Sequence, residues 1–481
     1  MTAGFRIRCY PTRAQAQTLA RWAGCQRFIQ NAKVSEDRYF RAFARKALGL
    51  PDPRPPLDQA YSQFIGEDTA WLREVPSPIL RNGAVLFRQA YTRFFAGLAG
   101  RPSIKKRGAR QAVWVTSELF TWDITQREGG QPVHTLHLGT KKFPVGVLKL
   151  EGHRLPAVTA APKSLHVSVE AGRWFVSFSL ENERDQHLPT FAETAEELRA
   201  WGETDLRAAT LGIDRGVAIP VAASDARAFD FSAVQRERLA RKERGAKRQQ
   251  RRLARQVKGS ANRRKTRARL ARKHQYARNV RQDFAHQTSH ALVSTPGVRM
   301  IVFEDLGVQH MTAAPKARQD TQGQYLANGA RAKAGLNAAI LRSAWGQVQQ
   351  TTQYKARKQA QLVLAVPAHH TSQECSRCGH TSPENRPTQA AFLCQACGHS
   401  DNADHNAACV IAARGVQVVL SGGYREREKV QARLGRARAH ALRPERSDVM
   451  PAEPGVSRAI PRDRTHPAWK QETPTTTAQA A

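Results

Sequence analysis

The chain has 481 residues and carries 76 lysines and arginines against 40 aspartates and glutamates, so its formal net charge is +36. Such an imbalance favours a polyanionic partner, and nucleic acid is the first candidate. The 41% share of hydrophobic residues excludes a wholly disordered protein, and the lack of any run of ~18 uncharged apolar residues excludes a membrane span.

The N-terminal half is predicted to combine helices with a small antiparallel sheet. Residues 4–10 alternate like a short strand, and residues 12–48 have the apolar spacing of a helix. The proline-rich stretch 49–58 separates this helix from a second region of helical spacing at 57–98. Between 112 and 182, short segments rich in β-branched and aromatic residues alternate with Gly and Pro. This pattern predicts an antiparallel barrel or sandwich.

The C-terminal half is predicted to contain a buried sheet interrupted by helices. Residues 183–205 form an acidic linker or short helix. The sequence TLGIDRGVAIPVAAS, from 210 to 224, predicts a hairpin of buried strands, and residues 298–306 and 360–368 predict further core strands. A long basic segment at 233–293 has helical character and lies between the first two of these.

Four cysteines have the spacing of a zinc site. Two C-x-x-C-G sequences can each bring two thiolates to one ion, because the glycine permits the tight turn that follows. Four thiolates leave no open coordination position, so the site would be structural. The doubled pairs favour metal binding over disulfide bonds, and therefore a reducing, cytoplasmic compartment. We expect His380 and His399 to be bystanders and Cys9, Cys25 and Cys409 to be core thiols. The predicted ligands are Cys375, Cys378, Cys394 and Cys397.

Three acidic residues interrupt apolar sequence. Asp214 lies in LGIDRGVAIP, Glu304 ends MIVFE, and Asp404 lies in DNADHNAACVIAA. A buried, unpaired carboxylate is costly, whereas carboxylates from three segments can hold two Mg²⁺ ions ~3.5–4 Å apart and hydrolyse a phosphodiester. Each acid has another interpretation, as a turn residue, a cap or a helix N-terminal charge. Asp305 and Asp401 remain competing ligands.

The basic segment has the character of a phosphate-binding surface. Between Arg241 and Arg281 there are eighteen lysines and arginines and a single acid, Glu243. The sequence KGSAN at 258–262 interrupts the run, so two helices forming a hairpin are expected. A solvated helix would mix charges of both signs, so phosphate neutralisation is favoured. The residues predicted to bind nucleic acid are Lys247, Arg248, Arg251, Arg252, Arg255, Lys258, Arg263, Arg264, Lys265, Arg267, Arg269, Arg272 and Lys273.

The order of these features resembles the TnpB family, the transposon-encoded ancestors of compact type V CRISPR effectors. Along the chain the order is GID, the basic hairpin, FEDL, TSQECSRCGH, a second C-x-x-C-G and D-x-NAA. The N-terminal sequence RIRCYPTRAQAQTL is also similar to the start of family members. The resemblance implies an α+β multidomain protein, with a RuvC-like RNase H fold, an inserted zinc ribbon and an N-terminal wedge β-barrel with a helical recognition insertion. The implied domains are 1–11 as the first barrel strand, 12–110 as the recognition helices, 111–200 as the barrel, 205–372 as the nuclease domain with the hairpin 233–293, 373–400 as the zinc ribbon, 401–420 as the last nuclease helix and 421–481 as a basic tail. We expect this tail to be mostly disordered.

The resemblance also implies an RNA-guided DNA endonuclease of a prokaryotic transposon. Its catalytic triad would be Asp214, Glu304 and Asp404, with Mg²⁺ as the catalytic and Zn²⁺ as the structural metal. A guide RNA would pair with target double-stranded DNA next to a short flanking motif. No membrane partner is expected, and the oligomeric state is left open. The alternatives are a compact type V CRISPR effector, a nuclease-inactive RNA-guided regulator, which the intact acid set disfavours, and a transposase that joins DNA ends.

Overall fold

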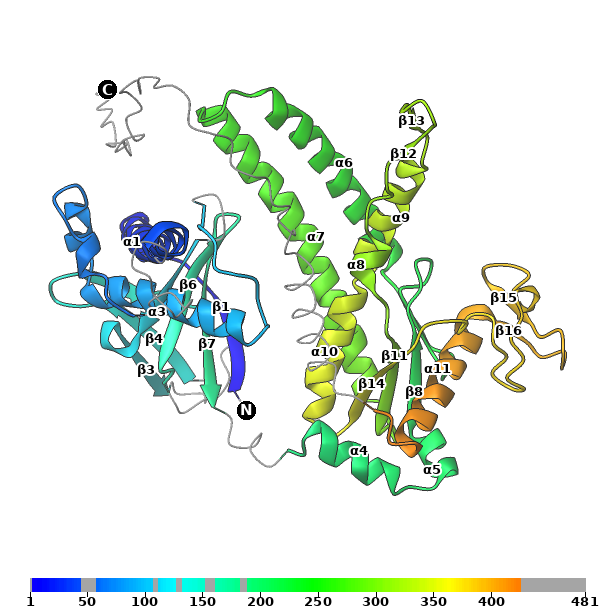
Figure 1. Ribbon diagram of the computed structural model, residues 1–481. Helices are drawn as coiled ribbons and strands as arrows, with labels where there is room; N and C mark the ends of the chain where they lie inside the picture. Colours follow the sequence, from blue (N-terminus) through cyan, green and yellow to red (C-terminus); the bar gives the residue numbers. More distant parts are fainter. Residues whose placement is uncertain are drawn as a thin grey trace. The chain divides into compact units, whose positions relative to one another are not determined.

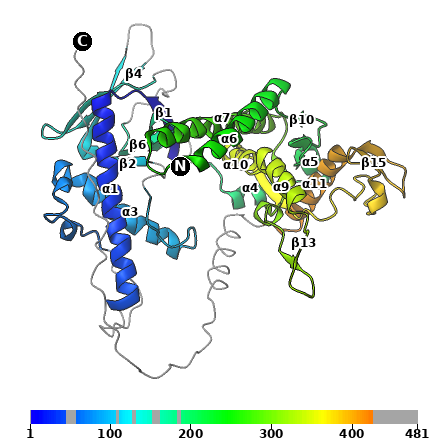
Figure 2. The same ribbon diagram turned by 90° about the horizontal axis from the view of Figure 1, so that it is seen from above.

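The computed structural model describes six stretches of the chain, namely residues 2–44, 58–106, 111–126, 132–151, 161–181 and 188–424. Nearly all of the proline-rich stretch 49–58 and of the tail predicted from residue 421 lies outside the described residues. Figures 1 and 2 show the described elements from two directions. Within these stretches, no helix is long and apolar enough to cross a membrane.

The N-terminal helices follow the prediction in part. After the strand β1 (Thr2–Cys9), helix α1 (Arg13–Tyr39) begins at a capping box in which the side chains of Thr12 and Gln15 bond each other's backbone N–H groups. The helix ends in a π-helical turn at Phe40–Ala44.

The second predicted helix is shorter than expected. Helix α3 spans Ser77–Phe95, and only 3₁₀ turns at Ser62–Phe64 and Ala70–Glu74 precede it. The prediction of a helix from residue 57 was therefore wrong. Pro76 is the N-cap residue and a second proline lies in the first turn, and proline is tolerated at a helix start but not in a helix interior.

The strands predicted between 112 and 182 are confirmed. They form two antiparallel ladders, in the orders β1-β7-β6-β2 and β3-β4-β5. A bridge between Cys9 and Leu150 links them, and both contribute to one hydrophobic core together with α1 and α3. A closed barrel stays a prediction. The strands are β2 (Gln111–Thr116), β3 (Phe120–Gln126), β4 (Pro132–Gly139), β5 (Pro144–Leu148), β6 (Ser164–Glu170) and β7 (Arg173–Glu181), with a 3₁₀ turn at Ser117–Leu119.

A five-stranded mixed sheet organises the C-terminal half, in the order β10-β9-β8-β11-β14. The first three strands along the chain form an antiparallel meander, and β11 pairs in parallel with both β8 and β14. The predicted hairpin and both further core strands are therefore present. The strands are β8 (Thr210–Asp214), β9 (Val221–Ala223), β10 (Ala228–Phe229), β11 (Met300–Glu304) and β14 (Leu362–Val366).

Helices cover both faces of this sheet (Figure 1). On one face Phe303 packs in a core with Val348 of α10 and residues of α7. On the other face Val302 packs with Ile411 of α11 and residues of α4 and α5. Adjacent residues of β11 thus bury opposite faces, as expected for a central strand. These helices are α4 (Phe191–Arg199), α5 (Glu203–Ala208), α7 (Ala261–Val293), α10 (Trp345–Arg357) and α11 (Ala403–Leu420).

Two glycines let α11 lie close to the sheet. A Cβ atom on Gly212 of β8 would lie 2.6 Å from the backbone nitrogen of Ala412 and closer still to the carbonyl oxygen of Ala408. A Cβ atom on Gly415 of α11 would lie 2.9 Å from a methyl group of Val302. These distances are shorter than van der Waals contact, so only glycine permits this separation.

The predicted basic hairpin is present. Helix α6 (Ala233–Arg255) packs along α7, and the connection contains Gly259 in the left-handed region and Ser260 as the N-cap of α7. Between β11 and α10 follow α8 (Val308–Met311), the two-residue strands β12 (Arg318–Gln319) and β13 (Tyr325–Leu326), and α9 (Ala330–Arg342). The segment between β14 and α11 holds a 3₁₀ turn at Pro383–Asn385 and the paired strands β15 (Ala391–Leu393) and β16 (Ser400–Asn402).

Candidate functional site

The three predicted acids converge on one pocket. Asp214 ends β8 and Glu304 ends β11, and because these strands are parallel neighbours their carboxyl ends meet at the same edge of the sheet. Asp404 lies in the first turn of α11, which packs against β8. All three side chains line the same pocket. Carboxylates from three separate segments of the chain therefore face one space.

The electrostatics of the pocket disfavour three free negative charges. Burial raises the pKa of Asp214 to about 7, with further contributions from the nearby charges of Glu304 and Asp404. Burial also raises the pKa of Glu304 and that of Asp404. Interaction with the neighbouring Asp214 and Thr371 side chains partly offsets the rise in the pKa of Glu304. A divalent cation would remove this repulsion, and carboxylate oxygens are ligands that Mg²⁺ prefers.

Residues to which the sequence analysis assigned no role hold Glu304 in place. The Thr371 hydroxyl donates a hydrogen bond of 2.6 Å to Oε1 of Glu304. The guanidinium of Arg215 is buried, donates to the backbone carbonyl of Glu304 and donates to Oε1 of Gln349 at 3.0 Å. Arg215 follows Asp214 directly, but its contact partner 89 residues away could not be read from the sequence.

Arg386, another residue to which the sequence analysis assigned no role, lies between the two cysteine pairs and contacts Asp404. Its guanidinium is 3.8 Å from Oδ1 of Asp404, and its side chain lines the acidic pocket. This cation partly opposes the burial that raises the pKa of Asp404. It places a positive charge at the pocket.

The two competing acids do not line the pocket. Asp305 is exposed, one residue beyond the end of β11. Asp401 instead bonds Nδ1 of His405 at 2.7 Å and the backbone N–H of Asn402 at 2.7 Å. The structure thus brings Asp214, Glu304 and Asp404 together and leaves Asp305 and Asp401 outside.

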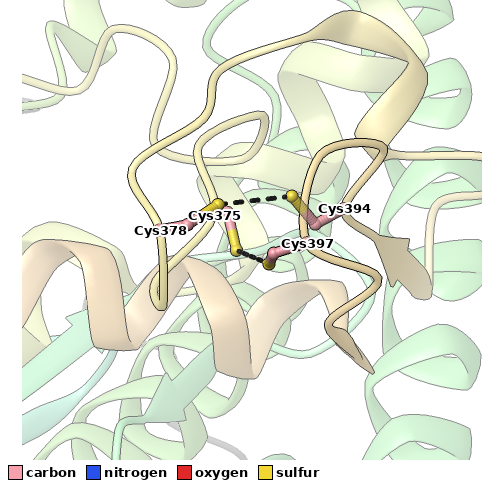
Figure 3. Close-up of side chains that lie close together, drawn as sticks. All are labelled: Cys375, Cys378, Cys394 and Cys397. Carbon is pink, nitrogen blue, oxygen red and sulfur yellow. Dashed lines mark hydrogen bonds between the residues drawn. The ribbon is translucent and has the colours of Figure 1, made fainter.

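The four predicted cysteines form one cluster (Figure 3). Their sulfur atoms all lie within 4.8 Å of one another, with 3.7 Å from Cys375 to Cys397 and 3.5 Å from Cys378 to Cys394. Tetrahedral ligands at a Zn–S distance of about 2.3 Å would be ~3.8 Å apart. The sulfur positions therefore fit a zinc ion, and the cluster contains neither His380 nor His399.

The turn geometry of both cysteine pairs supports this fit. Gly379 and Gly398, which follow the pairs, have φ angles of +74° and +71°. The N–H groups of Cys375 and Cys394 donate to the carbonyls of His380 and His399 at 3.0 and 2.9 Å. Each pair is thus folded into a tight knuckle, as the sequence predicted.

The other three cysteines are not metal ligands in this arrangement. Cys9 and Cys25 are buried in the N-terminal core, as predicted, and burial raises the pKa of each thiol to about 12. Cys409 is half-buried on α11, and burial raises its pKa to about 11. Such thiols are protonated at neutral pH and unreactive.

The basic hairpin presents most of the predicted residues to solvent. Arg263 and Lys273 are half-buried. Arg263 donates to the backbone carbonyls of Leu253 and Gln256 at the end of α6, and Lys273 lies against Gly245, whose added Cβ would be 2.6 Å from the Lys273 nitrogen. The exposed ones are Lys247, Arg248, Arg251, Arg252, Arg255, Lys258, Arg264, Lys265, Arg267, Arg269 and Arg272.

Three family models match the chain. They are described as a probable transposase at residues 187–314, a Cas12f1-like TNB domain at 345–411 and a helix-turn-helix domain at 1–36. The first covers β8, the basic hairpin and β11, and the second covers the cysteine cluster and Asp404. The description of the third as a helix-turn-helix domain differs from the structure, in which residues 2–36 form a strand and part of one helix.

Relatives match over most of the chain. It is 28% identical to a putative RNA-guided DNA endonuclease, InsQ, of Escherichia coli K12, over 87% of this chain and 93% of the relative. It is also 28% identical to a putative RNA-guided DNA endonuclease of Streptomyces pristinaespiralis, over 90% and 94%. Among solved structures, a Cas12f1 complex with single guide RNA and target DNA has a similar fold, with a TM-score of 0.50 and 11% identity over 86% of this chain and 98% of that one.

Proposed function

We propose that this protein, a member of the TnpB family of transposon-encoded proteins, is an RNA-guided DNA endonuclease. The family assignment agrees with the resemblance inferred from the sequence motifs and with the matches to family models and relatives. The observation that carries the proposal is the convergence of Asp214, Glu304 and Asp404 in one pocket. One buried and two partly buried acids in one pocket repel each other unless cations neutralise them, so metal-dependent chemistry on a phosphodiester explains their arrangement.

The sheet supports the finer assignment of a RuvC-like nuclease fold. An antiparallel meander followed by two parallel strands, with helices on both faces, is the arrangement implied by the family resemblance. The proposed site lies at the carboxyl ends of the two central parallel strands. Ligand sites of open sheets with helices on both faces commonly lie at such an edge.

The residues of the pocket have separate roles in the proposed reaction. Asp214, Glu304 and Asp404 would hold two Mg²⁺ ions, and when bound such a pair activates water and stabilises the leaving oxygen. Thr371 and Arg215 fix Glu304 through its carboxylate and its backbone carbonyl. Burial of the pocket strengthens every charge interaction inside it.

The four-cysteine cluster would hold a structural Zn²⁺ ion. Cys375, Cys378, Cys394 and Cys397 supply four sulfur ligands and thus a closed coordination sphere. Its role is to fold the segment between β14 and α11, which supplies Arg386 to the pocket.

The exposed basic face of α6 and α7 would bind the nucleic-acid backbone. Base pairing between a guide RNA and one strand of target DNA would select the sequence, while the protein reads backbone shape and a short flanking motif. The charge of +36 suits two polyanionic partners held at once.

A plasmid-cleavage assay tests the nuclease assignment. Asp214→Asn keeps the shape of the side chain but removes a charge from the metal site, and we expect cleavage to fall by at least about 10³-fold, in line with losses at other essential catalytic groups. Binding of guide RNA and target DNA should be unchanged. The matched control is Asp305→Asn, which changes an exposed acid outside the pocket and should cleave like the wild type.

The same assay separates the alternatives. Full activity of Asp214→Asn would reject the assignment of the site. Guided binding without any Mg²⁺-dependent cutting by the wild type would identify a regulator, and strand joining that survives RNase treatment would identify a transposase.

A further inference from the structure

The first cysteine knuckle is fastened to the helix that carries Asp404. Asn406 has no exposed surface. Its Oδ1 accepts a hydrogen bond of 3.0 Å from the N–H of Ser376, and its Nδ2 donates one of 2.8 Å to the carbonyl of Glu374. A single side chain of α11 therefore holds the backbone on both sides of Cys375.

A second residue of α11 holds the chain that leads into this knuckle. The guanidinium of Arg414 donates to the carbonyls of Pro367 and His369 at 2.9 and 2.8 Å, and it pairs with the carboxylate of Glu374. Thr371, in the same segment, bonds Glu304. Residues 367–376 thus contact both α11 and a carboxylate of the pocket.

The second knuckle is tied to the first by a buried amide. Asn385 donates to the carbonyls of Gln373 and His380 at 2.8 and 3.0 Å and accepts from the N–H of Gln395 at 2.9 Å. It has no exposed surface, and its neighbour Arg386 lines the acidic pocket. The two knuckles and the segment that supplies Arg386 to the pocket therefore belong to one hydrogen-bonded unit.

We propose that Asn406 is a positioning residue that couples metal occupancy of the four-cysteine cluster to the placement of Asp404. The inference rests on the proposed function, in which Asp404 is a ligand of the catalytic metal. Asp404 lies two residues before Asn406, and its N–H bonds the N-cap residue Asn402 at 2.9 Å. An empty cluster releases the knuckle, Asn406 loses both partners, and the first turn of α11 is no longer held against the pocket.

The coupling is reciprocal, because two sites that affect each other's binding do so equally in both directions. Mg²⁺ bound at the carboxylates should therefore strengthen the binding of zinc by the cysteines, and we expect this tighter binding to slow the release of zinc. A residue with only a structural role would not produce this dependence, since it would alter zinc retention equally with and without Mg²⁺.

The test measures zinc release from the full-length protein to a chromophoric zinc chelator, with and without Mg²⁺. For Asn406→Ala we expect release about tenfold faster, as for the loss of two buried hydrogen bonds, no slowing by Mg²⁺, and slower target cleavage. Asn406→Asp keeps the shape and the acceptor but not the donor, so release without Mg²⁺ should also accelerate. The control Gln417→Ala, an exposed amide on the same helix, should match the wild type.

The outcomes are distinct. Zinc release unchanged in both Asn406 variants, or wild-type cleavage by Asn406→Ala, would overturn the coupling. Loss of cleavage with unchanged zinc release would overturn it as well, because Asn406 would then act without the cluster. The chelator measurement needs no nuclease activity, so failure of the proposed function would appear separately, as a wild type that does not cleave.

Discussion

The close approach of α11 to β8 gives a sharp prediction for Gly212→Ala. The added Cβ would lie 2.6 Å from the nitrogen and 2.9 Å from the Cβ of Ala412, and closer still to the carbonyl oxygen of Ala408. Unstrained contacts need about 3.5 Å, so the helix must move away from the sheet by about 1 Å. Backbone atoms of α11 cannot rotate aside as a flexible side chain would.

This displacement acts directly on the proposed site. Asp404 lies one turn before Ala408 on the same helix, and a misplacement of about 1 Å at a reacting group can cost ~10²-fold in rate. Overpacking of this kind typically costs about 1–3 kcal/mol of stability. We therefore expect cleavage to fall ~10²-fold while the protein remains folded at assay temperature.

The assay is single-turnover cleavage of a guided target, with thermal unfolding followed by circular dichroism. Gly346→Ala is the matched control, because this exposed glycine lies in α10 and an added Cβ meets nothing within 4 Å. Alanine favours the helix there, so activity should persist with equal or slightly higher stability. A Gly212→Ala protein that cleaves and melts like the wild type would refute the argument that this contact places Asp404.

Two further predictions concern the metal cluster and the basic hairpin. Cys394→Ser removes one of four sulfur ligands, so the zinc content measured by metal analysis should fall from about one ion per chain to near zero. The control Cys409→Ser changes a cysteine outside the cluster and should keep its zinc. Equal zinc contents in the two variants would contradict the assignment. Replacing Arg251 and Arg255 together by Gln should weaken guide-RNA binding and make the negative slope of log affinity against log salt concentration shallower by about two. The control Arg207→Gln, on α5, should leave that slope unchanged, and an unchanged slope in the double variant would exclude these side chains as phosphate contacts.

The central sheet could be predicted because its strands are buried on both faces. Such strands appear as short runs of apolar residues, as in MIVFE and LVLAV. The hairpin could be predicted because Gly259 and Ser260 interrupt a continuous helical pattern. The helix at 57–98 was predicted too long because spacing alone does not locate a start, whereas Pro76 does.

The choice among the acids needed the three-dimensional fold. Successive side chains of a strand point in opposite directions, so Glu304 and Asp305 cannot both face the pocket, but their order does not say which one does. Asn402 caps α11 and so places Asp404 in its first turn. Arg386 and Thr371 reach the pocket only because the segment between β14 and α11 folds over it, and no local spacing encodes such contacts.

The position of α11 in the chain has a consequence for biosynthesis. Asp214 and Glu304 are translated well before Asp404, and α11 is the last described helix. A nascent chain that has not yet produced this helix holds two of the three acids on a sheet whose residues Val302 and Leu364 lack their covering partner Ile411. Under the proposed assignment of the three acids, a ribosome-bound chain would lack the third metal ligand, so it would not cut the DNA from which its own message is transcribed until α11 has emerged and folded.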